Sequence, residues 1–133
     1  MRFMLDTNIC IELIRNRSAI ILAKLQKMKP GAVCISSVTL SELEYGVAKS
    51  SAPERNRMAL MEFVTPIEVV PYDDRVAPHY GRIRADLERR GKTIGSLDTM
   101  IAAHALCLKL TVVTSNVREF ARVPGLKVEN WAK

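Results

Sequence analysis

The sequence has few of the residues that build disulfide-rich, zinc-binding or base-stacking proteins. It contains three cysteines, Cys10, Cys34 and Cys107, with no C-x-x-C pair, and only two histidines. A disulfide framework or a structural zinc site therefore finds no support, and we expect the cysteines to behave as small buried hydrophobes. Aromatic residues make up 5% of the chain, which argues against recognition of nucleic acid mainly by base stacking.

Long apolar runs are also missing. None approaches the roughly 20 residues that span a bilayer, and the N-terminal apolar run ends where Asp6 follows Leu5. That run is too short for a signal peptide, so we expect a cytoplasmic protein that does not enter the membrane. The composition is 48% apolar and 26% charged over 133 residues, which suits one globular domain spanning residues 1–133.

Positive charge exceeds negative charge. Lysine and arginine number 20 and aspartate and glutamate 14, which gives a formal net charge of +6. A basic surface attracts polyanions such as nucleic acid, although a generic solvated surface is the alternative. The densest cluster of candidate RNA-binding residues is Arg82, Arg84, Arg89, Arg90 and Lys92, and the further candidates are Arg15, Arg17 and Lys49.

Short apolar runs alternate with segments of helical periodicity. Strands are expected at residues 2–5, 32–35, 67–70 and 110–114, with a weaker strand at 126–128. Helices are expected at residues 9–16, 19–28, 37–49, 53–63, 74–90 and 97–108, with serines 36, 37 and 96 as caps. No hairpin signal separates the strands, so the pattern predicts an α/β sandwich of about five parallel strands flanked by helices.

Four acidic residues lie where such a sheet would place its ligand site, beyond the carboxyl ends of the strands. Asp6 follows the first strand, and Glu42 lies in the helix after the second. Asp98 is in the first turn of a helix, and Glu119 comes shortly after the fourth strand. Carboxylates brought together from separate elements are the ligands that Mg²⁺ prefers, so these four are the candidate catalytic and metal-binding residues.

Each acid also has a purely structural explanation. Asp6 would cap the helix that follows it, and Asp98 would suit the positive end of a helix dipole. Thr39 and Glu42 have the spacing of a capping box, and Glu119 could be a surface acid. The residues taken alone therefore indicate an acidic pocket, with a metal site as one explanation of it.

Four segments resemble the motifs of PIN-domain proteins, and specifically of VapC toxins, in order and at the family's spacing. They are MLDTNI at residues 4–9, SSVTLSELEYG at 36–46, IGSLDTMIAAHA at 94–105, and the stretch from VTSNVREF to ENW at 113–131. A lone Asp-Thr-Asn is weak evidence, whereas four motifs in register over nearly the whole chain are specific.

The resemblance implies a PIN-like three-layer sandwich and a metal-dependent endoribonuclease that arrests translation, with Mg²⁺ as cofactor and Mn²⁺ as a substitute. It implies initiator tRNA, cut in its anticodon loop, as the substrate. It also implies a VapB antitoxin as partner, with a homodimer and a toxin–antitoxin hetero-oligomer as assemblies. Hydrolysis by a metal-activated water would leave 5′-phosphate and 3′-hydroxyl ends.

The resemblance also assigns roles to individual residues. Asp6, Glu42 and Asp98 match three acidic positions of the family's site, with Asp6 and Asp98 as the metal ligands and Glu42 a further candidate. One carboxylate, with Glu42 as the candidate, would orient or deprotonate the attacking water. Thr7 and Thr114 are expected to orient carboxylates through hydroxyl hydrogen bonds.

The fourth acidic position of the family departs from its usual pattern. Where the family often has an aspartate two residues after the threonine of its T-x-D motif, this sequence has Asn116. Glu119, three residues further on, is expected to supply the missing charge and is a further candidate metal ligand. The substitution leaves open whether the site holds one metal ion or two.

Two other functions remain as alternatives. A phosphohydrolase with an aspartyl nucleophile would have Asp-x-Asp after its first strand, but Asn8 occupies the third position. A non-catalytic module that binds antitoxin or RNA would use the same acidic pocket without chemistry. His104 lies six residues beyond Asp98 and would not share its helix face, so we expect it to have a packing or surface role.

Overall fold

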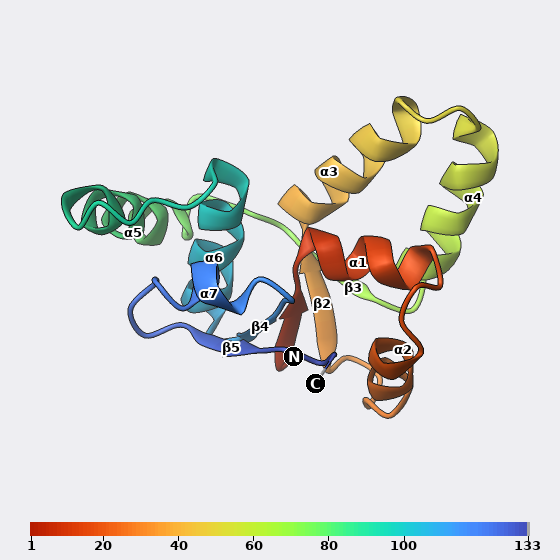
Figure 1. Ribbon diagram of the computed structural model, residues 1–133, viewed down its shortest axis with the longest axis horizontal. Coiled ribbons are helices and arrows are strands. Elements are labelled where there is room, and N and C mark those ends of the chain that lie inside the picture. The colour runs from red at the N-terminus through yellow and green to blue at the C-terminus, as the bar shows by residue number, and fades with distance from the viewer. Residues whose placement is uncertain (133) are drawn as a thin grey trace.

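Short strands alternate with one or two helices along the chain, as the hydrophobic pattern predicts. The computed structural model describes residues 1–132 (Figure 1); Lys133, the last residue of the predicted domain, lies outside them. The strands are β1 (Phe3–Leu5), β2 (Val33–Ser36), β3 (Glu68–Val70), β4 (Thr111–Val113) and β5 (Lys127–Glu129). The helices are α1 (Thr7–Ile14), α2 (Ala19–Gln26), α3 (Ser37–Ala48), α4 (Pro53–Val64), α5 (Ala77–Arg89), α6 (Ser96–Leu108) and α7 (Val117–Phe120).

The five strands form one parallel sheet in the order β3-β2-β1-β4-β5, which confirms the expected α/β class. The central strand β1 pairs on one side with β2, where Phe3 lies opposite Val33, and on the other with β4, where Met4 lies opposite Val112. The chain builds outward from β1 to β3 and then returns to the other side of β1. The carboxyl ends of β1 and β4 therefore flank a topological switch point, the usual place for a ligand in an open α/β sheet.

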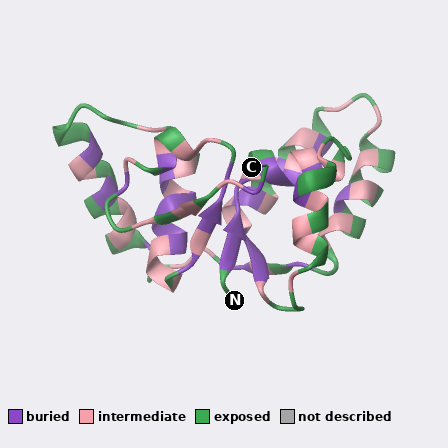
Figure 2. Ribbon diagram, turned by 60° about the horizontal axis from the view of Figure 1, so that its bottom comes forward, coloured by how far each residue is buried: buried purple, intermediate pink, exposed green. Residues whose placement is uncertain are grey.

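Alternate strand residues face opposite sides of the sheet, and each side has its own core. Phe3 and Leu5 pack into the core beneath α1, α2, α3 and α4, whereas Met4 packs with α5 and α6 on the other side. The buried central strands lie between two groups of helices (Figure 2). This is the three-layer arrangement that the sequence predicts.

Two predicted caps and one predicted helix start differ from the structure. Ser36 caps α3 by accepting a hydrogen bond from Val38, as expected. Ser37, also predicted as a cap, is instead the first residue of the helix, and Thr39 lies inside the first turn and does not begin a capping box. Ser96 is the first residue of α6, and no side chain caps that helix. Helix α5 begins at Ala77 and not at residue 74, because Pro78 lacks an N–H and is tolerated only in the first turn.

Other differences concern single elements. The four-residue helix α7 was not expected, and it carries Glu119. Cys10 and Cys34 are buried as predicted, but Cys107 is only partly buried. Within residues 1–132, no helix is long and apolar enough to cross a bilayer.

The C-terminal segment closes the core under β1. Trp131 is 2% exposed, and its ring meets that of Phe3 edge to face with centroids 5.2 Å apart.

We predict that Trp131→Ala lowers the free energy of unfolding by about 3–5 kcal/mol, the range for removing a large buried ring. Urea denaturation measures this, with Trp131→Phe expected to lose less. A loss below about 1 kcal/mol for the alanine variant would contradict the packing described.

Candidate active site

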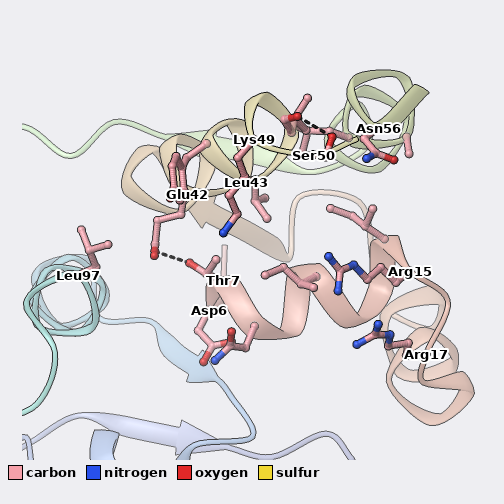
Figure 3. Close-up of a pocket in the computed structure, with 18 of the residues that line it drawn as sticks. Asp6, Thr7, Arg15, Arg17, Glu42, Leu43, Lys49, Ser50, Asn56 and Leu97 are labelled. Carbon is pink, nitrogen blue, oxygen red and sulfur yellow. Dashed lines mark hydrogen bonds between the residues drawn. The ribbon is translucent and has the colours of Figure 1, made fainter. Parts of the chain in front are cut away.

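A pocket of about 1050 Å³ opens beyond the carboxyl end of β1, between α1, α3, α4 and the start of α6 (Figure 3). Three of the four predicted acids line it, namely Asp6, Glu42 and Asp98. Asp6 and Glu42 follow β1 and β2, and parallel strands deliver such residues to one edge of the sheet. Asp98 reaches the same edge because it starts α6, the helix that leads back to the opposite end of β4. The topology thus brings together residues that are up to 92 positions apart in the sequence.

Asp6 serves both as a helix cap and as a site residue. Its Oδ1 accepts a hydrogen bond of 2.9 Å from the backbone N–H of Ile9, which caps α1, and its Oδ2 accepts one from the Thr114 hydroxyl. Burial raises the pKa of the Asp6 carboxyl, although these hydrogen bonds oppose the rise; the charge of Glu42 adds to it. The capping explanation of Asp6 is therefore confirmed, and the same residue also lines the pocket.

A chain of hydrogen bonds connects Asp6 to the fourth acid. The Thr114 hydroxyl, which donates to Asp6, accepts a hydrogen bond of 2.8 Å from the backbone N–H of Asn116. The Asn116 side-chain amide donates to Glu119 Oε2 at 2.8 Å. Asn116 therefore orients Glu119, and Thr114 orients Asp6 as the sequence predicts.

Glu42 is held by Thr7, the residue next to Asp6. The Thr7 hydroxyl donates to Glu42 Oε1 at 2.6 Å, so the second predicted orienting threonine also contacts a carboxylate. Helical periodicity in the sequence does not distinguish Glu42 from Glu44. The structure does, because Glu44 points to α4 and forms an ion pair of 2.8 Å with Arg57.

Asp98 is the acid that the other three affect most. Burial, and then the charges of Asp6, Glu119 and Glu42, raise its pKa to about 6. Because the charge of Glu119 is among the causes of this rise in pKa, Glu119 belongs to the same cluster although it does not line the pocket. No basic side chain in residues 1–132 forms an ion pair with any of these four acids.

The donor set fits a hard divalent cation. The polar groups around the cluster are carboxylates, hydroxyls and the carboxamides of Asn8 and Asn116, and neither histidine lines the pocket. Within the described residues, no group of three or more acidic, histidine or cysteine side chains is close enough to hold a metal ion by itself. Magnesium commonly binds through one or two carboxylates, with water and substrate phosphate completing its coordination shell. The negative charges of the clustered acids, which no basic side chain in residues 1–132 neutralises, would attract such an ion.

His104 has the packing role that the sequence predicts. It is 1% exposed on α6, its Nδ1 lies 2.8 Å from Ser36 Oγ, and its ring meets Tyr72 edge to face. Burial lowers the pKa of the imidazole. The contact ties α6 to the start of α3, the two helices that carry Asp98 and Glu42.

The structure places the predicted basic residues in two different regions. The cluster on α5 and its C-terminus does not line the pocket, and Arg84 and Arg90 in it pair with Glu88 and Asp86. Its role in RNA binding stays a prediction. The further candidates Arg15, Arg17 and Lys49 all line the pocket.

Sequence analysis did not identify Tyr45 as a pocket residue. Tyr45 is 65% exposed and lines the pocket, so at least one aromatic ring is available outside the core. The signal was present in the helical spacing, since Tyr45, Gly46 and Lys49 follow Glu42 by three, four and seven residues and share its face of α3.

The fold and site define a class of nuclease, and comparison with known proteins agrees. Residues 3–126 match the PIN domain family, whose nucleases are typically metal-dependent. The chain is 49% identical over 132 residues to the tRNA(fMet)-specific endonuclease VapC of Shigella flexneri, with 99% of each chain covered. The chain therefore belongs to the PIN-domain family and, within it, to the VapC endoribonucleases.

Solved structures support the same assignment. The DNA-bound VapBC of Salmonella typhimurium aligns with a TM-score of 0.94 at 47% identity, covering 98% of each chain. VapBC2 of Rickettsia felis, bound to a DNA fragment from its promoter, aligns with a TM-score of 0.94 at 38% identity, covering 98% of this chain and 99% of that one. The predicted family and enzyme class are confirmed.

The clustered charges predict an unusual stability effect for Asp98→Asn. Because its folded-state pKa of about 6 lies above the ordinary 3.8, Asp98 contributes stability that is present below pH 3.8 and lost as the pH rises through 6. Above pH 6 the metal-free variant should therefore be as stable as the parent or more stable, by about 1 kcal/mol. The difference should shrink toward pH 4, and thermal melts across this range measure it.

Metal addition provides the companion measurement. Mg²⁺ or Mn²⁺ should raise the melting temperature of the parent by binding only the folded state, and should raise that of Asp98→Asn much less. If Asp98 were only a first-turn helix acid, the variant would melt lower, by the equivalent of about 0.3–1 kcal/mol, and would keep the full metal response. That combination would remove Asp98 from the site.

Proposed function

We propose that this protein is a Mg²⁺-dependent toxin that hydrolyses one phosphodiester bond in the anticodon loop of initiator tRNA. The observation that carries the proposal is the gathering of three carboxylates around that of Asp98, with no basic partner for the four in residues 1–132. Burial and these charges raise the pKa of Asp98 to about 6. Repulsion among clustered carboxylates destabilises a protein that holds no metal. The same carboxylates provide the oxygen ligands for a divalent cation that also binds a phosphate.

Asp6 and Asp98 are the proposed metal ligands, with Glu42 and Glu119 as additional ligands. Magnesium held there would supply a water activated for attack and would neutralise charge on the phosphate oxygens. The Thr7 hydroxyl orients the Glu42 carboxylate through a hydrogen bond of 2.6 Å, and this carboxylate would serve to orient or deprotonate the attacking water. Cleavage of the P–O3′ bond then leaves a 5′-phosphate and a 3′-hydroxyl. Mn²⁺, which also accepts oxygen ligands, would substitute.

The proposed substrate follows from the relatives. The similar proteins of Shigella flexneri and Salmonella typhimurium are named tRNA(fMet)-specific endonucleases, at 49% and 47% identity over almost the whole chain. The net charge of +6 suits a polyanionic substrate. The basic cluster on α5 is proposed as a secondary contact with the tRNA outside the pocket.

Partners are proposed on the same basis. The aligned structures of Salmonella typhimurium and Rickettsia felis are VapBC complexes, so we infer a VapB-type antitoxin, encoded beside this gene, that suppresses the toxin. We further infer that residues 1–133 act as a single domain in the cytoplasm, as a homodimer and in a toxin–antitoxin hetero-oligomer.

The alternatives are less well supported. A phosphohydrolase with an aspartyl nucleophile needs a second acid two residues after Asp6, and Asn8 lines the pocket in that place. A non-catalytic module would bind RNA or antitoxin without cutting. Metal-dependent cleavage by the purified protein distinguishes the module from the enzyme.

The first test is cleavage of initiator tRNA by purified protein with Mg²⁺. Asp6→Ala and Asp98→Ala should each lower the rate at least about a hundredfold, since several kcal/mol of metal-assisted stabilisation are lost. Both should also abolish growth arrest when expressed without antitoxin. Sequencing of the RNA ends should find one dominant cut in the anticodon loop with a 5′-phosphate.

Glu44→Ala is the matched control. It removes a carboxylate two residues from Glu42 on the same helix, but one that is exposed and paired with Arg57, and exposed ion pairs contribute little to stability. Its activity should stay close to that of the parent. Undiminished toxicity of both folded aspartate variants would refute the site, whereas scattered cuts in messenger RNA would refute only the tRNA target.

A further inference from the structure

The pocket has two chemically different ends. Near the sheet it is acidic, with Asp6, Glu42 and Asp98, and further along the groove between α1 and α3 it is basic. The basic end consists of Arg15, Arg17 and Lys49 and is called the cationic end below. Figure 3 shows Lys49 directed into the pocket from α3, and Arg15 and Arg17 beyond the end of α1.

This separation follows from the topology. Helices α1 and α3 leave the carboxyl ends of the adjacent parallel strands β1 and β2 and pack against each other. Each ends in a basic C-cap residue, Arg15 on α1 and Lys49 on α3. At about 1.5 Å per residue, Lys49 lies roughly 10 Å along α3 from Glu42, and Arg15 lies a similar distance along α1 from Asn8.

The three cations have no acidic partner. No ion pair with Arg15, Arg17 or Lys49 forms within residues 1–132, although two arginines of the α5 cluster are paired. All three are exposed, and Lys49 Nζ lies 4.8 Å from the centre of the Tyr45 ring, which holds it at the groove. Unpaired cations that line a groove leading to a metal-type site are suited to a chain of phosphates.

We propose that the cationic end binds backbone phosphates of the RNA a few nucleotides away from the bond that is cut. The proposal rests on the proposed function and adds a substrate-binding subsite to it. The carboxylates repel RNA in the absence of a metal, so attraction must come from another part of the groove. Contacts to backbone phosphates fix the register of the strand without reading bases, so this subsite determines which bond lies over Asp6 and Asp98.

The test replaces the three cations together, as Arg15→Gln/Arg17→Gln/Lys49→Gln. Its control is Lys27→Gln/Lys29→Gln/Lys127→Gln, which also lowers the net charge from +6 to +3. Lys29 precedes β2 and Lys127 begins β5, so these two residues lie at the amino edge of the parallel sheet, opposite the pocket. All three control lysines are exposed, and the two triple variants differ only in where charge is lost.

With an anticodon stem-loop RNA and Mg²⁺, the pocket variant should lose about 10- to 100-fold in kcat/KM, mostly through a higher KM. The slope of log kcat/KM against log salt should become shallower by about 2, at about 0.7 for each lost single-strand phosphate contact. The control variant should show a much smaller change in both. Arg15→Lys/Arg17→Lys/Lys49→Arg keeps the charges and should restore most of the activity.

Each other outcome has a definite meaning. If the parent does not cut the RNA, the proposed function itself fails. If the parent cuts but the pocket variant matches the control in kcat/KM and salt slope, the cationic end is not an RNA subsite and the enzyme assignment stands. If the pocket variant cuts normally but escapes inhibition by the antitoxin, the cations bind the antitoxin and the inference is wrong. Circular dichroism confirms that each variant is folded.

Discussion

A single buried carboxylate, that of Asp6, connects the sheet, the first helix and the site. Its backbone N–H donates to Val113 of β4, its Oδ1 caps α1, and its Oδ2 accepts the Thr114 hydroxyl. A buried charge is tolerated only where hydrogen bonds satisfy it. The two donors to the Asp6 carboxylate are the Ile9 backbone N–H in α1 and the Thr114 hydroxyl just after β4, and both segments also border the site. The hydrogen bonds that stabilise the fold around Asp6 therefore also orient its carboxylate at the pocket.

The other acids depend on this arrangement. Glu42 is held by Thr7, the first residue of the helix that Asp6 caps. Asp98 lies at the start of α6 near the other three acids, and burial, followed by repulsion from their charges, raises its pKa. His104 and Ser36 join α6 to α3 through a buried contact of 2.8 Å, which keeps Asp98 and Glu42 in the same cluster despite that repulsion.

Local sequence signals predicted most of the fold, because strands that are buried on both faces are short apolar runs and helices here have clear caps or prolines at their starts. They failed where the signal was ambiguous. Serine at position 96 has the chemistry of a cap, yet the chain turns at Gly95 and Ser96 enters the helix. Helix α7 is a single turn, too short for periodicity to reveal it.

The site was predictable in part for a similar reason. Position directly after a strand marks Asp6, since topology brings such residues to one edge of the sheet, whereas Asp98 lies in the first turn of α6 and does not follow a strand. Choosing Glu42 over Glu44 as the site residue required the family resemblance, because helical periodicity does not distinguish the two glutamates. In the structure they differ because Glu44 forms an ion pair with Arg57 of α4. The cationic end was harder still, since Arg15 and Lys49 are distant in sequence and meet only because α1 and α3 run side by side.

Asn116 stands where the family often has an aspartate, and its hydrogen bonds connect two of the clustered acids. An aspartate at that position would add a fifth acid to a cluster of four in which the pKa of Asp98 is already raised to about 6. The amide instead donates to Glu119 at 2.8 Å, while its backbone N–H donates to Thr114. One residue thereby orients two others, Glu119 directly and Asp6 through the Thr114 hydroxyl. The glutamate side chain is longer than aspartate by one methylene, so it reaches the cluster from one turn of α7 and supplies the charge that the amide lacks.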